Sequence, residues 1–243
     1  MQTSGVNKDG TISSFITHDT VGSLLRRSAA RHPGKTAVVF RGRRYTYKEF
    51  NAHANCFGDA VVREGIGQGD RVAIMGANSY EYLVAWFGLA KRGITLVPIN
   101  LMLKGPEAGF IVNHSEARAL IIDEILVPAV RDELPNMKSL ELLICIGEGP
   151  PEGFIGFWDF LARGSKEEPE VDVAPEEIAM LAYTSGTEAL PKGVMLSHRA
   201  LISQYVSSIV DGGLRADDVA TVWMPLFHCA QMHCFTTPHV YLG

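Results

Sequence analysis

The sequence predicts an α/β protein built on a mostly parallel, helix-flanked sheet. Short apolar runs of strand length alternate with segments of helical periodicity along most of the 243 residues. This alternation is typical of parallel strands joined by crossover helices. The composition is that of a globular protein, because 47% of the residues are hydrophobic and 20% are charged.

The first part of the chain predicts a hairpin between two helices, followed by alternating strands and helices. A turn rich in glycine, residues 65–70, separates these two parts. The expected helices cover 21–31, 47–64, 79–91 and 106–113, and the expected strands cover 37–40, 44–47, 71–75, 95–99, 119–122 and 140–146.

Further along the chain, we expect two solvated loops, at 148–151 and in the charged run 166–170, on either side of a short helix over 157–162. An apolar strand over 178–183 comes next, and a second extended segment follows at 194–196. Ser197 is then a suitable N-cap for a helix that begins near His198 and ends at Gly212-Gly213.

The polar turn between the last two strands is the most informative feature of the sequence. It contains three hydroxyl residues, glycines and a lysine: Thr184, Ser185, Gly186, Thr187, Lys192 and Gly193. Glycines allow backbone N–H groups to approach an anion, and one lysine–phosphate contact is worth about 4 kcal/mol at about 4 Å before desolvation. The lysine precedes its glycine, which is the reverse of a Walker loop. The residues predict a polyphosphate site, with a plain surface turn as the alternative.

Three stretches of the chain resemble the adenylate-forming superfamily, which includes acyl-CoA synthetases, aryl-CoA ligases, luciferases and nonribosomal adenylation domains. They occur in the family's order and are residues 89–100 (LAKRGITLVPIN), 184–198 (TSGTEALPKGVMLSH) and 224–228 (MPLFH). The resemblance extends from about residue 20 to the C-terminus. Within the superfamily, the chain resembles the acyl- and aryl-CoA ligases. It has His228 at the position where amino-acid-activating domains carry an aspartate.

The resemblance implies a two-step reaction in the complete enzyme. A carboxylate, fatty or aryl, attacks the α-phosphate of ATP, and a thiol of coenzyme A then displaces AMP to give a thioester. Mg²⁺ would accompany the ATP. The implied ATP-binding residues are Thr184, Ser185, Gly186, Thr187, Glu188 and Lys192, and His228 is implied to lie near the acyl carboxylate and the thiol tunnel. A buried histidine satisfied by backbone carbonyls is the alternative for His228.

The chain departs from the family pattern at two positions and in its length. Glu188 and Ala189 stand where the family more often has a second hydroxyl residue and a glycine. A glutamate beside phosphates repels them unless it points away or shares a magnesium ion. The family is also roughly twice as long, which places the expected catalytic lysine beyond Gly243. We therefore expect residues 1–19 to be an extension and residues 20–243 to be an incomplete N-terminal AMP-binding domain, without the rest of that domain and the C-terminal lid domain.

The composition and the motifs of the sequence argue against several other classes of protein. The net charge of −5 and the pI near 5.9 argue against a nucleic-acid partner. Neither a signal peptide nor a membrane-spanning run is evident, so a cytoplasmic location is expected. A hydrolase is disfavoured because no glycine stands two positions before Ser185. A non-catalytic nucleotide-binding or interaction fragment remains the alternative function.

The four cysteines lack paired spacing and are expected to be reduced thiols. A metal site among His228, Cys229, His233, Cys234 and His239 is conceivable. Their spacings of five and six do not place them on one face of an α-helix, so we predict no metal ligands.

Overall fold

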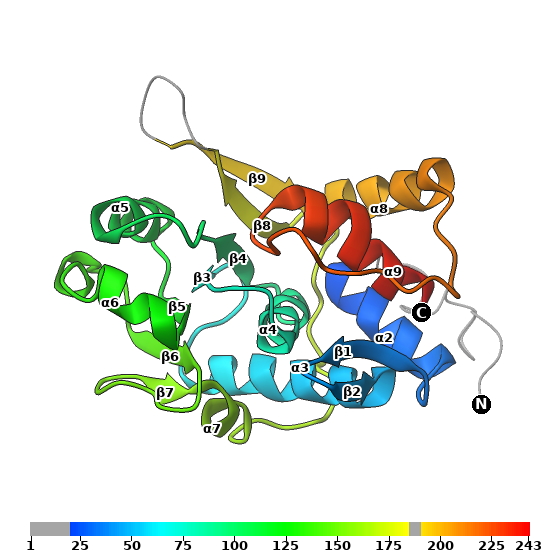
Figure 1. Ribbon diagram of the computed structural model, residues 1–243, viewed down its shortest axis with the longest axis horizontal. Coiled ribbons are helices and arrows are strands. Elements are labelled where there is room, and N and C mark those ends of the chain that lie inside the picture. The colour runs from blue at the N-terminus through cyan, green and yellow to red at the C-terminus, as the bar shows by residue number, and fades with distance from the viewer. Residues whose placement is uncertain (1–19, 185–190) are drawn as a thin grey trace.

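The computed structural model describes residues 20–184 and 191–243. The described part of the chain starts with a helix–hairpin–helix unit. Helix α2 and helix α3 enclose a two-stranded antiparallel sheet, and all four elements lie together in Figure 1. Their bounds are α2 (Val21–Arg31), β1 (Thr36–Phe40), β2 (Arg43–Thr46) and α3 (Tyr47–Arg63).

A seven-stranded sheet forms the centre of the molecule, in the strand order β7-β6-β5-β3-β4-β8-β9. All its pairings are parallel except the last one, between β8 and β9. The strands are β3 (Arg71–Met75), β4 (Thr95–Pro98), β5 (Ala119–Asp123), β6 (Leu142–Ile146), β7 (Ile155–Gly156), β8 (Ile178–Tyr183) and β9 (Gly193–Ser197).

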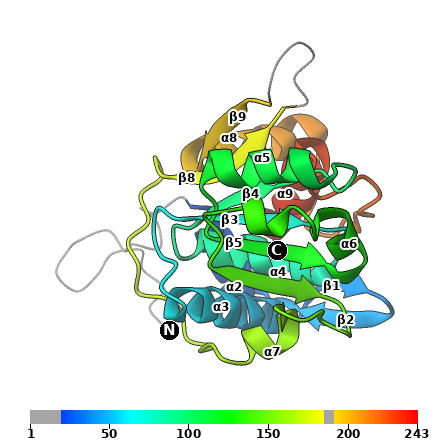
Figure 2. The ribbon, with the colours of Figure 1, turned by 90° about the vertical axis from the view of Figure 1, so that its left-hand side faces the viewer.

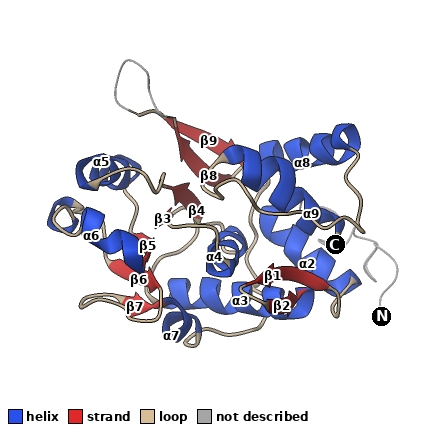
Figure 3. Cartoon of the chain, viewed as in Figure 1, coloured by secondary structure: helices blue, strands red, loops and turns tan. Residues whose placement is uncertain are grey.

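Helices cover both faces of this sheet, as Figures 1 and 3 show. The longer ones are α4 (Tyr80–Ala90), α5 (Gly105–Ser115) and α8 (His198–Gly212), and the short ones are α6 (Val127–Val130), α7 (Phe157–Leu161) and α9 (Thr237–Leu242). Two 3₁₀ turns, η1 (Glu124–Leu126) and η2 (Leu134–Asn136), flank α6, and a π-helix, η3 (Ala230–Thr236), precedes α9. No helix of the described ranges is both long enough and apolar enough to cross a membrane.

The two faces of the sheet belong to two separate hydrophobic clusters, because alternate residues of each strand point to opposite sides. On β3, Val72 and Ile74 face the larger cluster with α2, α3 and α4. Ala73 and Met75 face the smaller cluster with α5 and α6. Figure 2 looks onto this second face. Central strands that are buried on both sides explain why the sequence shows continuous apolar runs there.

Helices α3 and α4 approach each other closely at two glycines. A Cβ atom added to Gly58 would lie 2.5 Å from the carbonyl oxygen of Gly88, and one added to Gly88 would lie 2.7 Å from the carbonyl oxygen of Ala54. These separations exclude a side chain without movement of the helix backbones. The glycine pair therefore fixes the distance at which α3 packs on α4.

The predicted fold class is confirmed, and most predicted elements occur within two residues of their expected bounds. The sequence reading missed the edge strand β7 and the short helix α6. The charged run 166–170 is a loop with mostly exposed residues, as predicted, and Glu168 in addition forms an ion pair with the buried Lys91. That pair attaches the segment between α7 and β8 to helix α4.

Candidate functional site

The predicted polyphosphate turn lies at the end of the β8–β9 hairpin, which projects from the sheet in Figure 1. Tyr183 pairs with Gly193, and the backbone N–H of Thr184 donates to the carbonyl of Lys192 at 3.1 Å. Thr184 and Lys192 are exposed, so the hydroxyl and the ammonium stand at the two sides of the turn. Of the other predicted residues, Ser185, Gly186, Thr187 and Glu188 lie outside the described residues.

The strand that leads into this turn is anchored to helix α5. The hydroxyl of Tyr183 lies 2.7 Å from Nδ1 of His114, and the two rings meet edge to face at 5.7 Å. Partial burial raises the pKa of Tyr183, so the phenol stays protonated and can donate a hydrogen bond to the imidazole. This contact holds the last residue of β8 just before Thr184, and the sequence alone did not indicate it.

His228 is exposed at the entrance to the π-helix η3, which contradicts the alternative of a buried histidine. Its Nδ1 accepts a hydrogen bond from the backbone N–H of Ala230 at 3.2 Å. A nitrogen that accepts from an N–H carries no proton, so the neutral ring holds its proton at Nε2. His228 therefore presents an N–H donor, and its own backbone is held by Pro225 and Met232.

The π-helix places its polar side chains differently from an α-helix. His233 points into the core, where its Nδ1 lies 2.9 Å from the Tyr205 hydroxyl and its Nε2 lies 3.2 Å from the sulfur of Met180. Burial lowers the pKa of His233 to about 4. Cys229 and Cys234 are free thiols. Within the described ranges, no three His, Cys, Asp or Glu side chains are grouped as metal ligands.

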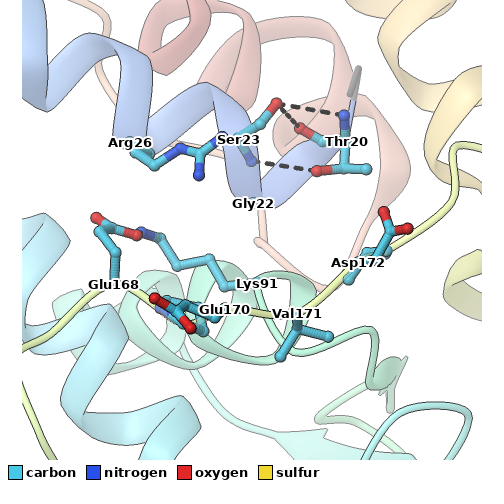
Figure 4. Close-up of a pocket in the computed structure, with 11 residues that line it drawn as sticks. Thr20, Gly22, Ser23, Arg26, Lys91, Glu168, Glu170, Val171 and Asp172 are labelled. Atoms are coloured by element: carbon cyan, nitrogen blue, oxygen red, sulfur yellow. Dashed lines mark hydrogen bonds and ion pairs between the residues drawn. The ribbon is translucent and has the colours of Figure 1, made fainter. Parts of the chain in front are cut away.

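A cavity of about 390 Å³ lies away from both predicted sites, between the start of α2 and the segment that precedes β8 (Figure 4). Lys91 lines it and extends to Glu168, with Nζ 2.7 Å from Oε2 of Glu168 and 2.7 Å from Oδ1 of Asn51. Because the ammonium is already bonded to a carboxylate and an amide, these groups have a structural role that does not require a ligand.

Strand β8 is in contact with both predicted parts of the site, the polyphosphate turn and the segment that follows His228. Thr184 and Lys192 are neighbours across the hairpin, and η3, which follows His228, contacts the same strand through His233 and Met180. Among the described residues, His228 makes no hydrogen bond to Thr184 or Lys192. Two residues that sequence reasoning missed, Asn78 and Gln231, hold the backbone just before His228.

Comparison with known proteins identifies the family to which the chain is similar. The sequence profile of the family described as AMP-binding enzyme matches residues 25–243. The chain is 35% identical over 213 residues to a long-chain-fatty-acid–CoA ligase of Thermus thermophilus, covering 84% of this chain and 38% of the relative. It is 30% identical over 216 residues to 4-hydroxybutyrate–CoA ligase 2 of Metallosphaera sedula, covering 86% of this chain and 39% of the relative.

A solved structure has the same fold. The crystal structure of the anthranilate CoA ligase AuaEII in complex with anthranoyl-AMP matches with a TM-score of 0.86 at 28% identity, covering 92% of this chain and 43% of that one. The chain thus spans about two fifths of the length of these proteins.

Proposed function

Because the chain belongs to the AMP-binding enzyme family, we propose that it is part of a ligase that uses ATP to activate a carboxylic acid and transfers the acyl group to coenzyme A. Residues 20–243 would belong to the N-terminal AMP-binding domain, and residues 1–19 would be an extension. We infer that the acid is a fatty or aryl carboxylate, as for the long-chain-fatty-acid–CoA ligase and the anthranilate CoA ligase to which the chain is similar, and that the enzyme acts in fatty-acid metabolism in the cytoplasm.

The observation that supports this proposal is the geometry of the β8–β9 turn. Lys192 is exposed and forms no ion pair with the described residues, and the Thr184 hydroxyl is exposed across the hairpin from it. An ammonium without an ion-pair partner among the described residues, beside a hydroxyl donor on the same hairpin, suits a polyphosphate. Ser185, Gly186, Thr187 and Glu188 are proposed to complete the contacts.

The reaction would proceed in two displacements. A carboxylate oxygen forms a bond to the α-phosphorus of ATP, the bond to the bridging oxygen breaks, and pyrophosphate leaves. The sulfur of coenzyme A then bonds to the acyl carbon, and AMP leaves. The protein must hold several negative charges in line during the first displacement, and Lys192 offsets part of that charge.

His228 is proposed to orient the carboxylate. Its proton at Nε2 makes it a donor to a carboxylate oxygen, and the Ala230 N–H keeps Nδ1 from accepting a proton at the same time. Mg²⁺ would arrive with the nucleotide, because this ion usually keeps waters and phosphate oxygens and needs only one or two protein carboxylates.

The test is carboxylate-dependent exchange of labelled pyrophosphate into ATP. It is measured on this chain and on the protein encoded to the next in-frame stop codon, with acids from acetate to palmitate and with cinnamates. Exchange that requires both ATP and an acid supports the ligase. Exchange in neither protein, with both folded by circular dichroism, would contradict it and would favour a non-catalytic nucleotide-binding or interaction fragment.

A further inference from the structure

Residues 222–226 lead to His228 without forming a helix or a strand, and a side chain from another part of the chain holds them. Asn78 lies in the loop after the central strand β3, one residue before Ser79, the N-cap of α4. Its Nδ2 donates to the carbonyl of Met224 at 2.8 Å and to that of Val222 at 3.3 Å. Its Oδ1 accepts from the backbone N–H of Leu226 at 2.7 Å.

Gln231 holds the same segment from the other side. This residue is fully buried in η3, and its Oε1 accepts from the backbone N–H of Met224 at 3.1 Å. Its Nε2 donates to the Thr236 hydroxyl at 2.9 Å. The Met224 N–H can only donate, so it fixes Oε1 as the end of the amide that faces Met224. Both backbone polar groups of Met224 are thus bonded to side-chain amides, where a sheet would have used a neighbouring strand.

We propose that Asn78 and Gln231 are positioning residues for His228, a role that rests on the proposed ligase function. By fixing Met224 and Leu226, they fix the backbone that enters the Pro225–His228 turn and hence the direction of the Nε2 proton. A group that orients a substrate acts well only if its own support is rigid. The end of a central parallel strand, where α/β proteins place their ligands, here supports this turn.

The chemistry of the clamp requires an amide at position 78. The side chain donates two hydrogen bonds and accepts one within a single planar group, and only Asn and Gln offer both functions in that form. An aspartate has the same shape, but when ionised it only accepts. It would place a negative charge against two carbonyl oxygens, so Asn78→Asp removes the function of the clamp with almost no change in volume.

The chain contains a matched control. Asn113 bridges a different loop in the same manner, with Nδ2 donating to the carbonyl of Asn136 at 2.9 Å and Oδ1 accepting from the N–H of Lys138 at 3.1 Å. It lies on α5, away from His228. Asn113→Asp therefore tests the loss of an amide clamp that does not support the proposed site.

The first measurement is nuclear magnetic resonance of this chain labelled with ¹⁵N. The imidazole signals of His228 are assigned by their absence in His228→Gln, and amide hydrogen exchange is followed at Met224 and Leu226. We expect the wild type to show the tautomer protonated at Nε2 and protected amides. In Asn78→Asp and in Gln231→Met, which removes the acceptor of the Met224 N–H, exchange at these amides should accelerate about tenfold or more, and the His228 ring should become a mixture of tautomers. Asn113→Asp should leave all these signals unchanged.

The second measurement uses pyrophosphate exchange in whichever form of the protein supports it. Asn78→Asp should raise the KM for the carboxylate about tenfold and change the KM for ATP by less than about twofold, because Lys192 and Thr184 are untouched. If Asn78→Asp does not fold, Asn78→Ser, which offers a single short hydroxyl in place of the amide, replaces it with the same expected direction.

The outcomes separate the two proposals. Absence of exchange in the wild type counts against the ligase function, and the NMR signals then decide alone whether the clamp holds His228. An unchanged His228 ring signal and unchanged amide protection in the Asn78 variants would overturn the inference even in an active enzyme. A KM for ATP that rises as much as that for the carboxylate would also overturn it, because the residue would then support the fold in general.

Discussion

The imidazole of His198 accepts a hydrogen bond from the backbone N–H of Val21 at 3.1 Å, across 177 positions of the sequence. Val21 is the first residue of α2, and His198 is the first residue of α8. The N–H groups of a first helical turn have no partner within their own helix, so the neutral ring completes the start of α2. His198 is fully buried, and burial lowers its pKa to about 4.

This contact predicts loss of stability in mild acid. The pKa of His198 in the folded state lies below the ordinary value of 6.5, so its contribution is fully present above about pH 6.5 and is lost as the pH falls toward 4. At pH 5 we expect the loss to be on the order of 2 kcal/mol, with a similar loss from His233. The difference between the free energies of unfolding in urea at pH 7.5 and at pH 5 measures this loss.

The replacement His198→Gln should reduce that pH dependence by about half, because one of the two histidines whose pKa falls to about 4 is gone. It should also lower stability at pH 7.5. His32→Asn is the control, since His32 is exposed. An unfolding free energy of the wild type that is equal at both pH values would contradict the assignment of buried neutral rings.

Removal of the Lys192 ammonium should weaken ATP use. We expect Lys192→Ala to reduce kcat/KM for ATP in pyrophosphate exchange by about 100-fold, as for the loss of one charge-assisted phosphate contact of about 3 kcal/mol. The KM for the carboxylate should change little. Lys138→Ala, at an exposed lysine on another loop, should behave as the wild type. Equal kinetics for the two variants would remove Lys192 from the site.

The ion pair of Lys91 with Glu168 should respond asymmetrically to substitution. The Lys91 side chain is only 3% exposed, whereas that of Glu168 is 37% exposed. Glu168→Gln leaves a buried ammonium without its counter-ion and should cost about 2 kcal/mol. Lys91→Met leaves a carboxylate that water can reach and should cost less than about 1 kcal/mol. Chemical denaturation of both variants and of the double variant gives the coupling energy.

Replacement of a glycine by alanine inside a helix usually stabilises a protein, but the close contact between α3 and α4 should reverse this effect at Gly58. Alanine is a better helix former than glycine by about 1 kcal/mol, but at Gly58 its Cβ would press on the carbonyl of Gly88. We expect Gly58→Ala to destabilise the fold by about 2 kcal/mol. Gly34→Ala, where nothing lies within 4 Å, should be neutral. Thermal unfolding compares the two, and a stabilised Gly58→Ala would contradict the close packing.

The sequence predicted the features that depend on local patterns. Buried strands appear as apolar runs, Ser197 was recognised as an N-cap, and Gly213 ends α8 in the left-handed conformation. The hairpin that presents Thr184 and Lys192 followed from two strands around a polar turn. A resemblance to a known family supplied the proposed role of His228, which composition and spacing alone did not provide.

The contacts that link distant segments were not predictable in this way. Asn78 bonds to Met224 across 146 positions, and its only sequence signal is a polar residue directly after a buried parallel strand. Glu168 was assigned to solvent because a run of charges usually is, and nothing local indicated that Lys91 would be buried opposite it. Such pairings depend on the tertiary fold rather than on periodicity.

The packing of α2 against α9 has a consequence for biosynthesis. Ser28 on α2 donates to the carbonyl of Val240, which lies 212 positions later, and Arg31 binds that of Tyr241. Ribosomes add about 5–20 residues per second, so α2 waits roughly 10–40 s for these partners. During that interval the part of its surface that packs on α9 is available to chaperones. The packing of α2 is therefore completed only after residues 240 and 241 have been synthesised, so a helix near the start of the described residues is among the last to reach its final contacts.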